Sequence, residues 1–251
     1  MFFLGVQKPK DWTSHDIVNL LRILTGIRRI GHTGTLDPFA TGVLVLAFQD
    51  ATKLIAHLPP TSKRYQCILQ LGRLTETADR TGEMVSIKDV PSGYEGLIQQ
   101  RVSDFMGDVE QTPPKYSAIK VNGRRLYEYA RAGQDVDIPS RIVQIHSLDV
   151  MADFNGVPVH TNQVALDLCC SKGTYVRSLG CDLAEAIGTV GFLEELTRSS
   201  SDGVDVQDCI TMDDLAEMAI GTRAYDWQRV LSKEGRQEFQ RCSREEFIQR
   251  L

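Results

Sequence analysis

The chain has 251 residues, a hydrophobic fraction of 42% and a formal net charge of −5. This composition supplies enough apolar side chains for a folded core and argues against an intrinsically disordered protein. No stretch approaches the length of apolar sequence that a membrane-spanning helix needs, so we expect no membrane partner. The six cysteines form no CxxC pair, which predicts no zinc site and indicates reduced thiols in a cytoplasmic protein.

The negative net charge argues weakly against nucleic-acid binding, but binding depends on where the charges lie. Residues 1–30 hold five basic side chains against two carboxylates, and residues 115–142 hold six against three. Residues 200–251 are acidic, with eleven carboxylates against seven bases. The first two regions could line one basic face. A random distribution of surface charge is the alternative, and charge alone does not exclude it.

Strands and helices follow each other along the chain without a regular period. In chain order the patterns predict a strand at 1–6, a helix at 15–25, a glycine-rich loop at 31–42, a strand at 43–48, a short helix through 54–58, a strand at 64–71, a polar loop at 71–82, a helix at 94–106, a hairpin turn at 121–124, a helix at 126–132, paired strands at 141–151 and 163–170 around Asn155-Gly156, a helix at 174–187, a strand at 190–197 and a helix at 211–219. This order predicts an α+β fold built around a largely antiparallel sheet.

The first helix carries clear end signals. Thr13 or Ser14 can cap its N-terminus, and Gly26 can end it. Ser14, His15 and Asp16 are assigned to this cap, because a catalytic triad requires convergence in space and not adjacency in sequence.

The loop at 31–42 presents one carboxylate, that of Asp37. Three glycines allow the loop unusual backbone angles, and Pro38 fixes its own φ while it disfavours a helical conformation for Asp37. A stiff loop that carries a single carboxylate suits a nucleophile or a general base. An ordinary Asp-Pro turn is the alternative for such a dipeptide taken alone.

Seven segments carry a family pattern in order and spacing. They are residues 8–14, 31–42, 63–65, 71–82, 113–120, 126–131 and 171–179. Together they resemble the bacterial tRNA pseudouridine-55 synthases of the TruB family, over about residues 4–215. The resemblance implies a pseudouridine synthase fold: a catalytic domain over residues 1–220, with an inserted thumb hairpin over about 113–142. The acidic tail at 221–251 is expected to be too short for the PUA-type RNA-binding domain that many relatives carry.

The same resemblance implies the chemistry. Such an enzyme isomerises the T-loop uridine at position 55 of tRNA to pseudouridine after the base is flipped out of the loop. It uses no cofactor and no metal. The implied partner is tRNA, bound through its T-arm, without a guide RNA, and the protein is expected to act as a monomer.

Family roles transfer onto individual residues of this chain. Asp37 corresponds to the catalytic aspartate, Arg177 to the arginine that pairs with it, and Tyr65 to the aromatic residue that stacks on the flipped uracil. The residues implied in substrate binding are His32, Tyr175, Leu196 and Lys8, the last in a motif whose role is mainly structural. The residues implied in RNA binding by the thumb are Lys115, Lys120, Arg124, Arg125 and Arg131.

Alternatives stand beside these assignments. Taken alone, Tyr65 is typical of a core aromatic residue, Arg177 of a surface residue or a helix salt bridge, and His32 of a loop residue that forms hydrogen bonds. The chain departs from the family at Gln7 and Asp11, and it lacks a second arginine beside Arg198. A tRNA-folding chaperone that does not need Asp37 is a different functional class with the same fold. A subunit that works with guide RNA is a third alternative, which the short basic thumb disfavours.

Overall fold

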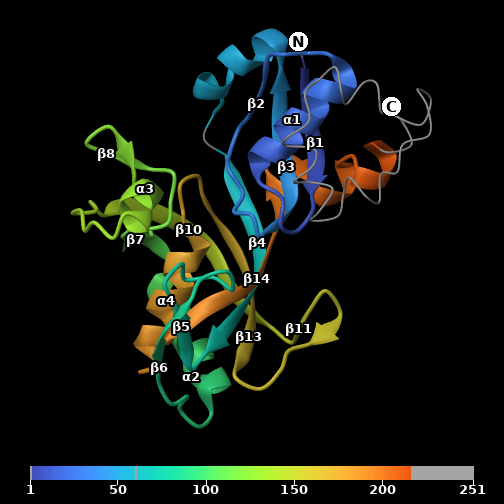
Figure 1. The fold of residues 1–251 in the computed structure, drawn as a ribbon. Coiled ribbons are helices and arrows are strands. Elements are labelled where there is room, and N and C mark those ends of the chain that lie inside the picture. Colours follow the sequence, from blue (N-terminus) through green and yellow to red (C-terminus); the bar gives the residue numbers. More distant parts are fainter. Residues whose placement is uncertain (1, 60, 216–251) are drawn as a thin grey trace. The chain divides into compact units, whose positions relative to one another are not determined.

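The computed structural model describes residues 2–59 and 61–215, which fall into two compact units (Figure 1). The described part of the first unit comprises residues 2–59 and 198–215, and that of the second comprises residues 61–197. The predicted tail at 221–251 and the end of the helix predicted at 211–219 lie outside the described residues. No helix in the described part of the chain is both long and apolar enough to cross a membrane.

The first unit is a small sheet with one covering helix. Its elements are β1 (Phe2–Lys8), α1 (Ser14–Thr25), β2 (Ile30–His32), β3 (Thr41–Phe48), the 3₁₀ turns η1 (Gln49–Lys53), η2 (Ile55–His57) and η4 (Val206–Asp208), and β15 (Val204–Asp205). β3 pairs antiparallel with both β1 and β2, and seven of its eight residues are buried. The Gln7 N–H donates to the Ile210 carbonyl and the Ile210 N–H donates to the Gly5 carbonyl, so Ile210 covers the outer edge of β1. The strand that leads out of the glycine-rich loop is therefore the centre of this unit.

Helix α1 forms as its end signals predict. Thr13 is the N-cap and forms a reciprocal box with Asp16: the Asp16 N–H donates to Thr13 Oγ1 (3.0 Å), and the Thr13 N–H donates to Asp16 Oδ2 (2.8 Å). Gly26 ends the helix in the left-handed conformation, with φ of 68°. The assignment of Ser14 to the cap is wrong, because its buried hydroxyl binds the backbone of Leu36 instead.

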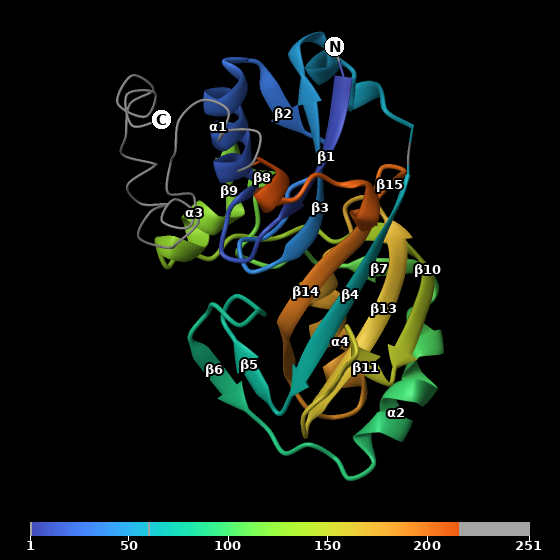
Figure 2. The same ribbon diagram turned by 90° about the vertical axis from the view of Figure 1, so that its right-hand side faces the viewer.

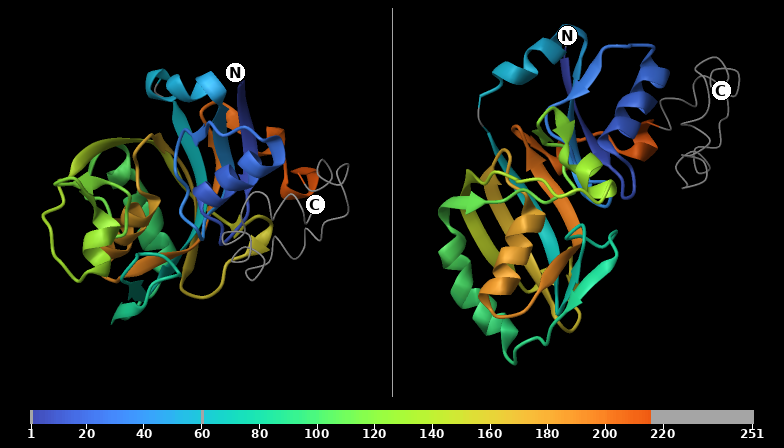
Figure 3. Two further views of the ribbon diagram at one scale, coloured as in Figure 1. Left: turned by 45° about the horizontal axis from the view of Figure 1, so that its top comes forward. Right: turned by 60° about the vertical axis from the view of Figure 1, so that its left-hand side comes forward.

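The second unit is built on a larger sheet. Its principal elements are β4 (Ser62–Leu71), α2 (Tyr94–Arg101), the 3₁₀ turn η3 (Val102–Phe105), β7 (Gly107–Gln111), β10 (Arg141–Met151), β13 (Gln163–Ser171), α4 (Val176–Ala186) and β14 (Gly191–Ser201), whose last residues belong to the first unit. The strand order is β14–β4–β13–β10–β7, and the pairs β4–β13, β13–β10 and β10–β7 are antiparallel. Helices α2 and α4 lie on the same face of this sheet (Figures 2 and 3).

Three small ribbons extend from the second unit. They are β5 (Arg73–Thr75) with β6 (Met84–Ile87), β8 (Lys120–Val121) with β9 (Arg124–Arg125), and β11 (Asp153–Phe154) with β12 (Val157–Pro158). In the β8–β9 hairpin, Asn122 and Gly123 both have positive φ, as the predicted two-residue turn requires. Helix α3 (Leu126–Arg131) follows directly, so the region predicted as a thumb contains a hairpin and a short helix.

Most predicted elements are confirmed, and so is the α+β class. Strand β7 was not predicted, because only one of its five residues is a large apolar side chain and its pairing with β10 is what makes it a strand. The short helix through 54–58 is wrong in type, since 3₁₀ turns occupy 49–53 and 55–57. Asn155-Gly156 forms the turn of the β11–β12 ribbon between the two long strands.

Candidate active site

Asp37 lies half-buried in a loop of the first unit that is fixed through its backbone. The Ala40 N–H donates to the Asp37 carbonyl (3.1 Å), which closes a tight turn over Pro38. The Ser14 hydroxyl both accepts from the Leu36 N–H (2.9 Å) and donates to the Leu36 carbonyl (3.2 Å). The residue before Asp37 is therefore held from helix α1, and Leu36 itself is buried.

Lys8 lies beneath the same loop and is only 1% exposed. Its Nζ donates to the carbonyls of Pro9 (2.9 Å), Trp12 (2.6 Å) and Pro38 (3.1 Å). Burial lowers the pKa of Lys8 to about 7, and the Asp37 carboxylate opposes this shift. The structure therefore places Lys8 where it anchors the carbonyl that follows Asp37 in the chain.

Arg198 anchors the loop from β14 and is as deeply buried as Lys8. Its guanidinium donates to the carbonyls of Val43 (2.8 Å), Gly34 (3.1 Å) and Thr35 (3.4 Å). Gly42, with φ of 99°, lies so close that a Cβ would stand 2.2 Å from the Arg198 carbonyl oxygen. Any larger residue at position 42 would displace the strand that holds this arginine.

Arg177 occupies the first turn of α4 in the second unit and is 3% exposed. Its Nη1 donates to the Thr77 carbonyl (2.7 Å) and its Nη2 to the Tyr116 carbonyl (2.9 Å). Nη1 also lies 3.5 Å from Asp79 Oδ2 in a buried ion pair. These bonds fix the plane of the guanidinium, so Arg177 is not the surface residue that its type alone would favour.

Asp79 organises the polar loop that supports Arg177. Its Oδ1 accepts hydrogen bonds from the Thr77 hydroxyl (2.8 Å), the Thr81 N–H (2.9 Å) and the Thr81 hydroxyl (2.5 Å). Gly82 packs so tightly that a Cβ would lie 2.4 Å from Thr77 Oγ1. Asp79 lies in the segment 71–82, for which the sequence predicted no individual role, because nothing local indicates that its partner is Arg177 in a distant helix.

Three further predicted residues lie in the second unit. Tyr65 is a buried residue of β4 and pairs in register with Leu168. Tyr175 is the residue that precedes α4, and the Arg141 guanidinium lies 5.0 Å from its ring centroid. Leu196 is buried in β14. Tyr65 and Leu196 thus have the burial of core residues, which a pocket wall also requires.

The thumb region carries exposed cations that lie on aromatic rings. The guanidinium of Arg124 stands 4.7 Å from the Tyr129 ring centroid, while those of Arg125 and Arg131 stand 5.8 and 5.4 Å from the Tyr127 ring centroid. Lys115 forms an exposed ion pair with Asp135, and Lys120 is exposed in β8. Exposed guanidiniums beside tyrosines are suited to contacts with RNA phosphates and bases.

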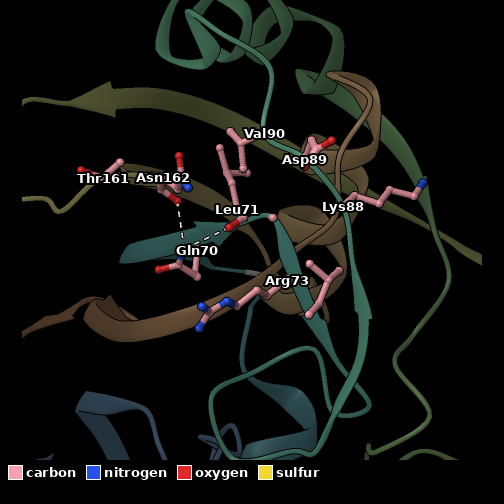
Figure 4. A pocket seen from close by; sticks show the side chains of 10 residues that line it. Gln70, Leu71, Arg73, Lys88, Asp89, Val90, Thr161 and Asn162 are labelled. Atoms are coloured by element: carbon pink, nitrogen blue, oxygen red, sulfur yellow. Dashed lines mark hydrogen bonds between the residues drawn. The ribbon is translucent and has the colours of Figure 1, made fainter.

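A cavity of about 420 Å³ lies at another place in the second unit (Figure 4). It is lined by Gln70, Leu71, Gly72, Arg73, Ile87, Lys88, Asp89, Val90, Thr161 and Asn162. None of these is a predicted site residue. Figure 4 shows the charged ends of Arg73 and Lys88 pointing in different directions, so the two cations do not converge on one ligand position.

Comparison with known proteins decides the family. Residues 22–176 match the N-terminal domain of the TruB family of pseudouridylate synthases. The chain belongs to the TruB family. Relatives named tRNA pseudouridine synthase B include one from Arthrobacter sp. (strain FB24), 42% identical over 91% of this chain and 77% of the relative, and one from Acaryochloris marina, 40% identical over 86% and 73%. The predicted membership of the TruB family is confirmed, and this TruB-family protein belongs to the isomerase class of enzymes.

Solved structures agree on the fold. A Cbf5–Nop10–Gar1 complex contains a chain that is 25% identical to this one, with a TM-score of 0.63, over 90% of this chain and 57% of that one. An H/ACA RNP bound to a substrate RNA containing 2′-deoxyuridine gives a TM-score of 0.60 at 23% identity, over 90% and 56%. This chain therefore spans a little over half of those longer chains. The predicted pseudouridine synthase fold is confirmed.

The predicted site residues of this TruB-family protein are divided between the two units. The first unit holds Lys8 and Asp37 together and carries His32 in β2. The second holds Tyr175 beside Arg177 at the start of α4 and carries Tyr65 in β4. The convergence of Asp37 with Tyr65 and Arg177 in one cleft remains a prediction.

Proposed function

We propose that this chain is a tRNA pseudouridine synthase that converts the T-loop uridine at position 55 to pseudouridine, with Asp37 as the catalytic carboxylate. Family membership supports the reaction class, and the relatives named tRNA pseudouridine synthase B support tRNA as the substrate. A location in the cytoplasm accords with that substrate and with the reduced state predicted for the six cysteines.

The proposed reaction is an isomerisation that needs no redox step. The bond between uracil N1 and ribose C1′ breaks, and a bond between uracil C5 and C1′ forms. The proton on C5 leaves to solvent, N1 gains a proton, and the mass is unchanged. The base first leaves the folded T-loop, which costs a few kcal/mol of unstacking and unpairing. The released uracil must then be held and turned in a site that excludes water.

Each proposed role follows from the chemistry of the side chain. The Asp37 carboxylate acts as nucleophile or as general base at the reacting ring or sugar. The Arg177 guanidinium pairs with it and keeps it ionised, while the Tyr65 ring stacks on the uracil. His32 holds the loop bases open. Tyr175 and Leu196 line the pocket, and Lys8 contributes through the loop that it anchors.

The observation that carries this proposal is the fixed backbone around Asp37. Buried polar side chains of Lys8, Ser14 and Arg198 bind carbonyls or amides on both sides of it. A reacting group gains rate when its position is set before the substrate arrives, because little reorganisation is then needed at the transition state. An ordinary surface turn needs no such support from three buried side chains.

The thumb at 113–142 is proposed to grip the T-arm through Lys115, Lys120, Arg124, Arg125 and Arg131. The protein is proposed to act as a monomer and without a guide RNA, on a catalytic domain that extends over residues 1–220. The exposed cation–tyrosine pairs of the thumb support RNA contact at this place.

The test is a purified protein incubated with a T-arm stem-loop and no other RNA. Pseudouridine should form at the T-loop uridine, and Asp37→Asn should lower the rate by at least about a thousandfold while the affinity for the stem-loop changes little. Asp50→Asn is the matched control, since Asp50 is an exposed aspartate of the same unit. Turnover retained by Asp37→Asn would refute the assignment, and a requirement for added guide RNA would refute independent action.

A further inference from the structure

Gln111, the last residue of β7, has an unusual pair of contacts. Its side chain is 1% exposed, and its amide binds both backbone groups of Tyr175. The Tyr175 N–H donates to Gln111 Oε1 (2.7 Å), and Gln111 Nε2 donates to the Tyr175 carbonyl (3.0 Å). The Gln111 side chain thus forms the two reciprocal hydrogen bonds that a paired β-strand residue would form. Both bonds are partly buried, and losing them would leave the buried Gln111 amide without these partners, which is costly.

The start of α4 depends on these contacts. Tyr175 is the N-cap of the helix, but its own side chain makes no capping hydrogen bond. The neighbouring residues are tied to the same segment: the Ser178 hydroxyl donates to the Thr112 carbonyl (2.8 Å), and Arg177 Nη2 donates to the Tyr116 carbonyl (2.9 Å). The first turn of α4 is therefore fixed by the chain that runs from β7 into the thumb.

Strand β10 also contacts Tyr175. Arg141 of β10 is the register partner of Gln111. Its guanidinium donates to the Gly173 carbonyl and lies over the Tyr175 ring. The backbone of Tyr175 is thus hydrogen-bonded from β7, and its ring is contacted by a guanidinium from β10.

We propose that Gln111 is a positioning residue for the reaction: it sets the first turn of α4 and thereby the orientation of the Arg177 guanidinium and the Tyr175 ring. The inference rests on the proposed function, in which these two side chains act around the uridine. Gln111 touches neither substrate nor Asp37 in this role. It acts through the two residues that it holds.

The experiment compares Gln111→Leu with Gln163→Leu. Gln163 is the matched control, because it is a buried glutamine of the same unit that also makes two hydrogen bonds, to Gln70 Oε1 and from the His160 N–H (both 3.1 Å). Gln111→Leu should lower single-turnover pseudouridine formation by roughly 10–100-fold with less than about a threefold change in stem-loop affinity. Gln163→Leu should lower thermal stability comparably and leave the rate unchanged. Equal rate losses in both variants would overturn the proposal.

Amide hydrogen exchange provides a readout that does not depend on activity. The Leu179 N–H donates to the Tyr175 carbonyl and reports the first turn of α4. Its exchange should accelerate by at least about tenfold in Gln111→Leu and not in Gln163→Leu. Unchanged exchange in Gln111→Leu would overturn the positioning role of Gln111, whether or not the protein makes pseudouridine. A wild-type protein that makes no pseudouridine would refute the proposed function, but it would leave the exchange result valid.

Two further variants test the bond to the Tyr175 carbonyl and the proposed route through Arg177. Gln111→Glu keeps the volume and the bond from the Tyr175 N–H, but it replaces the donor that faces the Tyr175 carbonyl with an oxygen. Because the buried carboxylate is then repelled by that carbonyl, the variant should lose at least as much rate as Gln111→Leu, and a rate equal to wild type would overturn the proposal. Combined with Arg177→Lys, Gln111→Leu should cost less than the product of the two single effects, because both act on one guanidinium. Fully multiplicative losses would contradict the proposed route through Arg177.

Discussion

At the scale of single residues, the candidate catalytic carboxylate depends on polar side chains that are buried beneath it. Lys8, Ser14 and Arg198 each bind the backbone of the 31–42 loop, and each is no more than 3% exposed. Buried polar groups are costly unless they are hydrogen-bonded, so three of them beneath one loop indicate that its conformation is strongly specified. The carboxylate itself can then stay half-buried and accessible.

Lys8 gives a prediction for stability against pH. Burial lowers its pKa from the ordinary 10.5 to about 7; the carboxylates of Asp37, Asp11 and Asp16 oppose the shift, and Arg198 adds to it. Between these two values the unfolded chain binds the proton that the folded protein releases, so the free energy of unfolding should rise with pH across this window. In urea unfolding, the free energy of unfolding of wild type minus that of Lys8→Met should therefore rise from about pH 7.5 to about pH 9.5.

The control is Lys53→Met, at an exposed lysine of the same unit, which should follow wild type across the range. A constant difference between wild type and Lys8→Met would show that Lys8 keeps its proton throughout.

At the scale of elements, local sequence signals explain the helices and the hairpin well. The Thr13–Asp16 box, the Gly26 end and the Asn122-Gly123 turn each act within a few residues, and all three are present as predicted. Strand β7 and the start of α4 are different. Both depend on partners far along the chain, and neither has a local signal of its own. Local chemistry therefore predicts capped helix ends and tight turns, but not a strand or a helix start that is set by distant partners.

The N-cap of α1 gives a prediction at this scale. Thr13→Ala removes the acceptor for the Asp16 N–H and should lower the free energy of unfolding by about 1 kcal/mol. Chemical denaturation measures the change. Thr52→Ala is the control, because the Thr52 hydroxyl only donates to an exposed backbone carbonyl that water can solvate. Equal effects of the two substitutions would contradict the role of the cap.

At the scale of the whole molecule, the charge distribution matters more than the net charge. A protein of net charge −5 can bind RNA only where its basic residues are concentrated. The thumb region supplies such a concentration, with Arg124, Arg125 and Arg131 lying against tyrosine rings. RNA affinity should therefore depend strongly on this one segment and on salt.

Replacing Arg124, Arg125 and Arg131 by alanine should weaken binding of the T-arm stem-loop and reduce the slope of log affinity against log salt by about 2–3, since each phosphate contact contributes a little under one unit. The control removes three exposed basic residues outside the thumb, Arg73, Lys88 and Arg101. Filter binding over a range of salt concentrations measures both slopes. Equal changes in the two triple variants would place the RNA-binding surface elsewhere.

The sequence by itself determined the features that depend only on local chemistry and on the order of motifs. These are the helix ends, the Asn-Gly hairpin, the stiff loop around Asp37, and the family, which requires only residue types at the right spacing. Tertiary structure alone decided which polar side chains are buried as supports. Ser14 reaches Leu36 across 22 residues, Gln111 reaches Tyr175 across 64, and Arg198 reaches Gly34 across 164. A side chain carries no local mark of a partner so distant, because the contact arises only when the sheet brings both segments together.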